Sequence, residues 1–81
     1  PFVWFIHNEE SIKVWQVEVV ESFGELTEGT IANVDKNGIE VATGEHNLLL
    51  SIIQIPGKKA QTVADIINGK PDLFVVGQRL L

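Results

Sequence analysis

Two adjacent lysines, Lys58 and Lys59, form the one cluster of positive charge in the sequence, and they follow a Pro56-Gly57 turn. An apolar run precedes this turn and a short helical pattern follows it, so the pair lies ahead of a helix N-terminus. Ammonium groups beside the positive end of a helix dipole and its free N–H groups are suited to contact a phosphate. The alternative is an ordinary polar loop between a strand and a helix, and the residues leave both interpretations open.

The sequence offers little for catalysis or metal binding. Its serines have no Gly-x-Ser-x-Gly context and it contains no Cys, so we expect neither a nucleophilic triad nor a thiolate metal site. Strand pairing could bring His7 and His46 together with Glu45 as a third ligand. The simpler expectation is one histidine at a strand end and one in a turn, both in solvent. We therefore predict no catalytic residues and no metal.

Charge is unevenly distributed along the chain. The net charge of −5 argues against general affinity for nucleic acids, because counterions displaced around Lys and Arg drive the binding of polyanions. Residues 1–48 have two lysines against nine acidic residues, a net charge of −7, whereas residues 49–81 have a net charge of +2. Any contact with a polyanion must therefore come from the C-terminal half, whose basic residues are Lys58, Lys59, Lys70 and Arg79.

The elements that position the lysines are those of a small β protein. Runs of β-branched and aromatic residues separated by turn signals predict strands over residues 2–7, 12–20, 30–34, 39–43, 48–55 and 73–81. Asn37-Gly38 between two of these runs indicates a β-hairpin. The apolar phase changes near Val14-Trp15 and again between Ile52 and Ile53, which indicates a bulge or bend in each long strand.

Residues 61–68 are expected to form one short helix. Thr62 followed three residues later by Asp65 resembles a capping box. Val63, Ile66 and Ile67 recur at helical spacing and form one apolar stripe. Beyond them, Gly69 stands where a left-handed C-cap residue is expected, and Pro71 prevents the helix from continuing.

About six strands that switch faces, with one short helix, favour a mainly β, partly closed barrel of the OB type; a flat sandwich is the alternative. We expect a single domain of residues 1–81 with no membrane-spanning segment. Because the sequence begins at Pro1 and contains no Met, we also expect it to be part of a longer protein. The aromatic residues mostly lie in apolar strand patterns, which predicts core packing rather than base stacking for Phe2, Trp4, Phe5, Trp15, Phe23 and Phe74.

The Gln-Ile-Pro-Gly-Lys-Lys sequence at residues 54–59, with the helix pattern that ends at Gly69, resembles the hallmark of the C-terminal domain of methionyl-tRNA formyltransferases. That hallmark is a Leu-Gln-x-x-Gly-Lys-Lys segment followed by a short helix ending in Gly. Residues 12–15 are similar to the family's first long strand, residues 28–31 to its Pro-Gly-Thr-Val, and residues 38–44 to its next hairpin. The resemblance covers nearly the whole chain.

The resemblance implies an OB-like barrel attached to an N-terminal Rossmann-type catalytic domain in a cytoplasmic enzyme. That domain carries the family's catalytic Asn, His and Asp and the site for the formyl-tetrahydrofolate donor, so no cofactor is expected in this chain. For the barrel it implies a non-catalytic contact with the backbone of initiator tRNA. By position, Lys58 and Lys59 would make this contact, with Lys70 and Arg79 as additional candidates.

The chain departs from the family pattern in ways that favour a second interpretation. Phe2-Val3 and Val76-Gly77 stand where the family has Pro-Gly, and Glu28 replaces the Pro of Pro-Gly-Thr. The tRNA-binding version of the domain also tends to be basic, whereas this chain is acidic. Related barrels belong to formyltransferases that act on nucleotide sugars and to folate-dependent hydrolases, where RNA binding is not expected. A structural or interdomain module without RNA binding is therefore the alternative.

Overall fold

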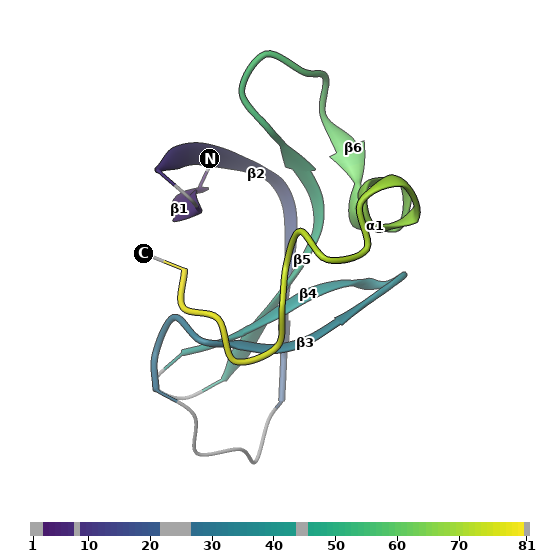
Figure 1. Ribbon diagram of the computed structural model, residues 1–81. Coiled ribbons are helices and arrows are strands. Elements are labelled where there is room, and N and C mark those ends of the chain that lie inside the picture. Colours follow the sequence, from purple (N-terminus) through teal and green to yellow (C-terminus); the bar gives the residue numbers. More distant parts are fainter. Residues whose placement is uncertain (1–2, 8, 22–26, 44–45, 81) are drawn as a thin grey trace.

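An antiparallel sheet that curls into a half-barrel forms most of the protein (Figure 1). The computed structural model describes residues 3–7, 9–21, 27–43 and 46–80. Within them the elements are β1 (Val3–His7), β2 (Glu10–Val20), β3 (Ile31–Asp35), β4 (Gly38–Ala42), β5 (Asn47–Gln54), β6 (Gln61–Thr62) and α1 (Val63–Gly69). The strand order is β1-β2-β5-β4-β3, and β6 pairs with β5. The predicted fold class, mainly β with a partly closed barrel and one short helix, is confirmed.

Both long strands are irregular where the apolar phase of the sequence changes. The register of β2 against β5 shifts between Val14 and Gln16, so Trp15 is an extra residue on β2. It shifts again between Gln16 and Val17, where Ser51 is the extra residue on β5. Extra residues of this kind increase the local twist of a sheet and let it coil. The predicted bulge near Trp15 is confirmed, and the irregularity in the second strand lies close to its predicted position.

The hairpin of β3 and β4 forms as predicted. Asp35 pairs with Gly38, and its Oδ1 accepts a hydrogen bond from the backbone N–H of Asn37 at 2.8 Å. Gly38 has φ +147°, and a Cβ atom there would lie 2.5 Å from the backbone oxygen of Leu50 on β5. A glycine is needed at this point because β4 and β5 approach too closely for a side chain.

The N-cap of α1 agrees with the sequence, but the helix begins at Val63 and not at residue 61, because Gln61 and Thr62 pair with β5 as β6. Thr62 is the N-cap, and its hydroxyl oxygen accepts a hydrogen bond from the backbone N–H of Asp65 at 3.2 Å. Val63 and Ile66 are buried, and Ile67 packs against the core, so the predicted apolar stripe faces the sheet.

The end of α1 differs from the prediction. Gly69 is the last helical residue and does not have the positive φ of a left-handed cap. Lys70 is the C-cap instead, and its backbone N–H donates to the carbonyl oxygen of Ile66 at 2.9 Å. The helix therefore ends by leaving the helical conformation at Lys70, one residue before Pro71.

The predicted final strand over residues 73–81 is wrong for the part that the structure describes. The segment turns at Gly77, whose φ is +93°, and meets the sheet in one isolated bridge between Thr30 and Arg79. The backbone of Ile31 accepts from Gly77 and donates to Gln78, both at 2.8 Å. The segment crosses the open face of the sheet in Figure 1. The sixth strand is instead the two-residue β6.

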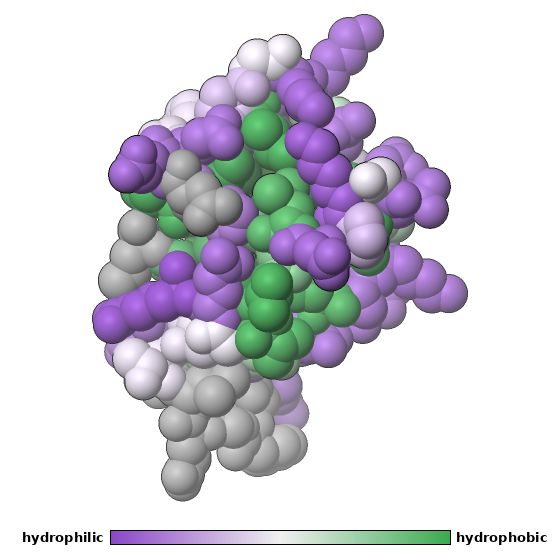
Figure 2. Space-filling view, in the orientation of Figure 1, coloured by the Kyte–Doolittle hydropathy of each residue, from purple (hydrophilic) through white to green (hydrophobic). Residues whose placement is uncertain are grey.

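The core lies between the curled sheet, α1 and this C-terminal segment. Four of the strands, α1 and the segment contribute its buried members, Ile12, Val14, Ile31, Ile39, Leu50, Ile53, Val63, Ile66, Phe74 and Leu80. An apolar area is visible in the middle of the face shown in Figure 2. The C-terminal segment crosses this face and exposes Val75 and Val76. Within the described residues α1 is the one helix, and its seven residues are far too few to cross a membrane.

Candidate functional site

A tight turn after β5 presents the two adjacent lysines. The backbone N–H of Lys58 donates to the carbonyl oxygen of Ile55 at 3.0 Å, with Pro56 and Gly57 at the two central positions. Gly57 has φ +79°, the value that the second central residue of a type II turn requires. Lys58 and the next residue, Lys59, are both exposed. The sequence thus fixes the backbone of the turn and leaves the ammonium groups on the surface.

The Gln54 side chain connects this turn to β2. Its Nε2 donates to the backbone oxygen of Lys58 at 2.9 Å, and its Oε1 accepts from the indole N–H of Trp15 at 2.8 Å. One side chain at the end of β5 therefore holds the turn and the bulge of β2 together.

The four basic residues selected from the sequence do not all lie together. Lys58 and Lys70 line one pocket of about 150 Å³, together with Asp65. Arg79 lines a different pocket beside Glu28, and its backbone pairs with Thr30 at the start of β3. The structure therefore groups the lysines of the β5–α1 region and separates Arg79 from them.

The helix N-terminus is less available to a phosphate than the sequence suggests. β6 intervenes between Lys59 and the first residue of α1, so the lysines do not directly precede the helix. Thr62 already accepts from one of the first N–H groups of α1. A phosphate contact at the turn would thus depend on the lysine side chains themselves.

Trp4 and Trp15 contradict the prediction that the aromatic residues pack in the core. Trp4 is 58% exposed and Trp15 is 46% exposed. Phe5 and Phe74 do follow the prediction, because Phe74 is buried and Phe5 packs against the core. Phe2 and Phe23, like Glu45, lie outside the described residues.

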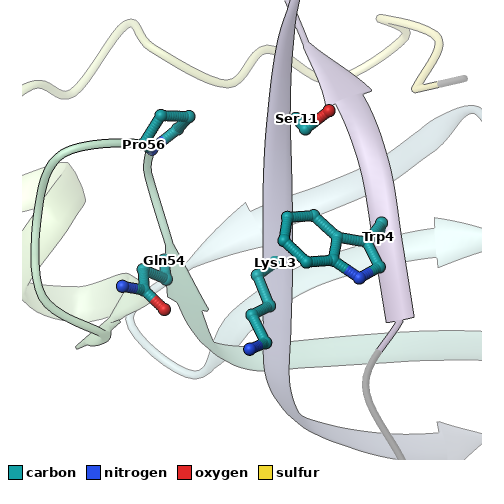
Figure 3. A pocket seen from close by; sticks show the side chains of 5 residues that line it. All are labelled: Trp4, Ser11, Lys13, Gln54 and Pro56. Atoms are coloured by element: carbon teal, nitrogen blue, oxygen red, sulfur yellow. The ribbon is translucent and has the colours of Figure 1, made fainter.

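The exposed tryptophans flank Lys13. Trp4 on β1, Lys13 on β2 and Gln54 on β5 are direct partners across the three neighbouring strands, so their side chains share one face. The Lys13 ammonium lies 5.6 Å from the ring centroid of Trp4 and 4.8 Å from that of Trp15, within the range of cation–π contacts. An open pocket of about 460 Å³ lies here and is lined by Trp4, Ser11, Lys13, Gln54 and Pro56 (Figure 3).

This tryptophan–lysine cluster, comprising Trp4, Lys13 and Trp15, was missed by the sequence analysis, although β2 contains a signal for it. Ile12 and Val14 are buried and alternate with Lys13. Because side chains alternate between the two faces of a strand, a lysine among apolar residues indicates that its own face is exposed to solvent. Trp15 continues on the side of Lys13, so its exposure could have been inferred from its neighbour.

The two histidines have separate surroundings. His7 is 5% exposed, its ring packs on Phe74 with centroids 4.6 Å apart, and its Nε2 lies 3.2 Å from Oε1 of Gln78. The expectation of a solvent-exposed His7 is therefore wrong, whereas His46 is exposed as expected. Among the described residues no three His, Cys, Asp or Glu side chains are grouped in a way that could hold a metal ion.

Comparison with known proteins identifies relatives over most of the chain. The family model described as the C-terminal domain of formyl transferases matches residues 1–71. A methionyl-tRNA formyltransferase of Colwellia psychrerythraea is 49% identical over 73 residues, which are 90% of this chain and 22% of that protein. The chain thus spans about a fifth of the length of this relative.

Proposed function

Because the chain belongs to the formyl transferase C-terminal domain family, we propose that it is a non-catalytic accessory domain of a methionyl-tRNA formyltransferase that contacts the backbone of initiator tRNA through Lys58 and Lys59. The identity of 49% to a methionyl-tRNA formyltransferase supports this choice of parent enzyme. In this proposal the one-carbon chemistry and its formyl-tetrahydrofolate donor belong to a separate N-terminal catalytic domain in the cytoplasm.

The observation that carries the proposal is the presentation of Lys58 and Lys59 on a fixed turn. The Ile55–Lys58 hydrogen bond and the contact from Gln54 hold the backbone, while both lysines are exposed. A defined backbone with mobile ammonium groups suits contact with phosphates without readout of base sequence. Lys70 shares a pocket with Lys58 and can add a contact, whereas the role of Arg79 stays a prediction.

The contact is expected to be weak. With about three basic contacts the electrostatic free energy gained from counterion release is small. The N-terminal part of the chain, residues 1–48, carries a net charge of −7, which opposes the approach of a polyanion. We therefore expect the isolated barrel to bind tRNA weakly and mainly at low salt, and to assist a catalytic domain in the longer enzyme.

The test is binding of initiator tRNA to the 81-residue chain, measured by fluorescence anisotropy at low and at physiological salt. We expect salt-sensitive binding that the double change Lys58→Glu/Lys59→Glu abolishes. Lys36→Glu is the charge-matched control for each single change, because Lys36 is exposed in the β3–β4 hairpin. If Lys36→Glu weakens tRNA binding as much as Lys58→Glu does, the result contradicts a contact at the turn.

A second candidate function is favoured by the acidic charge of the chain. In this alternative the domain is a structural or interdomain module of a formyltransferase that acts on a small molecule, a nucleotide sugar or a folate, and it binds no RNA. Its net charge of −5 is the observation in its favour. If neither this chain nor the longer enzyme binds tRNA at low salt, the result favours this alternative.

A further inference from the structure

We propose that the tryptophan–lysine cluster, with Gln54, forms a binding site for one unpaired nucleotide of an RNA. The base would stack on an indole and its phosphate would lie at the Lys13 ammonium group. The ligand class rests on the proposed function, but the site is distinct from the turn of Lys58 and Lys59. Lys13 lies in the acidic N-terminal part, where the charge distribution predicts no polyanion contact, so the proposal departs from that expectation and relies on base stacking for most of the affinity.

Two indole rings are exposed at or next to one pocket. Trp4 is 58% exposed and lines the pocket. Trp15 is 46% exposed and contacts Lys13 and Gln54, which also line it. Exposed aromatic rings beside positive charge are the arrangement by which proteins bind unpaired bases, since every base has a π face. The volume of about 460 Å³ lies within the range of pockets that hold small ligands.

Lys13 lies beside both rings. Its ammonium group is within 6 Å of both ring centroids, so it can reach a phosphate attached to a nucleotide on either ring. Stacking of a base on an aromatic ring contributes more than an exposed cation–π contact does. A base can therefore take over the ring face while the lysine turns to the phosphate.

The pocket also has polar lining residues, Gln54 and Ser11. Gln54 uses one donor in its bond to Lys58 and one acceptor position in its bond to Trp15. Its amide keeps one further N–H and one further lone pair for a base edge. Ser11, opposite Ile6 at the β1–β2 end of the pocket, adds a hydroxyl that donates and accepts. Figure 3 labels both residues among the side chains that line the pocket.

The cluster is also linked to the turn of Lys58 and Lys59. Through Gln54 the cluster is one hydrogen bond away from the backbone of Lys58. A strand of RNA with one base on the cluster would thus have neighbouring phosphates near the exposed lysines. A neighbouring protein domain fits this surface less well, because lysine is depleted in the cores of protein interfaces and Lys13 lies in the middle of the row from Trp4 to Gln54.

The intrinsic fluorescence of the chain tests this proposal directly. The chain contains two Trp and no Tyr, and both tryptophans belong to the cluster. Titration with single-stranded hexaadenylate at low salt should quench this fluorescence in a saturable way. An RNA duplex of the same number of phosphates is the control and should quench little, because its bases are already stacked.

The variants Trp4→Ala and Val76→Ala separate stacking from unspecific loss of apolar surface. Both residues are 58% exposed, so neither change removes a core contact. Trp4→Ala should weaken hexaadenylate binding about five- to 150-fold, whereas Val76→Ala should leave it unchanged and Trp4→Phe should retain most of it. Trp15 reports the titration in Trp4→Ala. Equal affinity of the Trp4→Ala and Val76→Ala variants, or no quenching of the unmodified chain, overturns the proposal.

Variants of the lysine turn and of the cluster together distinguish this site from the proposed function. If Lys58→Glu/Lys59→Glu leaves tRNA binding intact, the proposed contact at the turn fails, while the hexaadenylate titration still decides on the cluster. If Trp4→Ala leaves hexaadenylate binding intact but weakens association with a separately prepared catalytic domain, the cluster is a protein interface and the proposal is overturned.

Discussion

The indole N–H of Trp15 donates a hydrogen bond to Oε1 of Gln54 at 2.8 Å, and this contact joins the bulge of β2 to the turn that follows β5. The other end of the same amide donates to the backbone oxygen of Lys58 at 2.9 Å. Trp15 is the extra residue of the bulge, so the irregularity in β2 places its ring where Gln54 can reach it. The two candidate contact regions are thus positioned by one glutamine.

Gln54→Leu should loosen both regions. The change removes two hydrogen bonds of a type that contributes about 0.5–1.5 kcal/mol each, so we expect the free energy of unfolding to fall by about 1–3 kcal/mol. Urea denaturation followed by circular dichroism measures it without relying on Trp15. Gln16→Leu, at an exposed position on β2, is the control. Equal stabilities of the two variants would show that the Gln54 bridge contributes nothing.

Alanine at Gly38 and at Gly69 should have opposite effects. At Gly38 the new Cβ would meet the Leu50 carbonyl oxygen at 2.5 Å in a positive-φ conformation, so a loss of at least about 2 kcal/mol is expected. At Gly69 no atom lies within 4 Å and the residue is helical, so alanine should stabilise by up to about 1 kcal/mol. Thermal unfolding of both variants is the measurement. Destabilisation by Gly69→Ala would mean that the helix end differs from the structure.

Thr62→Ala should show how much the cap of α1 contributes. Loss of the hydroxyl leaves the backbone N–H of Asp65 without this acceptor, which typically costs about 1 kcal/mol. Thr62→Ser keeps an N-cap oxygen and should retain most of the stability. Chemical denaturation of both variants tests the cap, and an equal loss in Thr62→Ser would point to the lost methyl group instead.

The sequence could predict the local features because each has a short-range physical cause. The Thr62–Asp65 spacing determines the cap, and the change of apolar phase at Val14-Trp15 requires an irregular strand. The β3–β4 hairpin follows from the turn residues before Gly38. These features depend on residues that lie within a few positions of one another.

Long-range features were harder to predict. Across the bulge at Trp15 the inner face of β2 passes from even to odd positions, because Val14 pairs with the buried Ile53 whereas Val17 pairs with the buried Leu50. Val17 and Val19 are nevertheless 39% and 68% exposed. The apolar pattern of β2 assigns them to the inner face but does not say whether a distant segment covers that end of the strand.

The C-terminal segment illustrates a second reason. Its apolar residues suit a strand, and Phe74 and Leu80 are indeed buried. The chain nevertheless turns at Gly77, so the segment covers the open side of the half-barrel instead of joining the ladder. The burial of this segment was therefore predictable from its apolar residues. Its backbone conformation was not, because it depends on Gly77, and a glycine can also occur within a strand.

The salt dependence of tRNA binding should report the number of lysines in contact with phosphates. Each neutralised phosphate contributes about −0.9 to the slope of log K against log salt on a duplex, so contacts by Lys58, Lys59 and Lys70 predict a slope between about −2 and −4. Lys58→Glu/Lys59→Glu should bring this slope close to −1 or abolish binding. Lys36→Glu should leave the slope as it is, because Lys36 belongs to the separate β3–β4 hairpin.

Arg79→Gln extends this measurement to the residue that lies apart from the lysines. Arg79 lines a pocket beside Glu28 and not the pocket of Lys58 and Lys70. If tRNA contacts only the lysines of the β5–α1 region, Arg79→Gln should give the same slope of log K against log salt as the unmodified chain. A slope that becomes shallower by about 1 in Arg79→Gln would instead show that the RNA also reaches the start of β3.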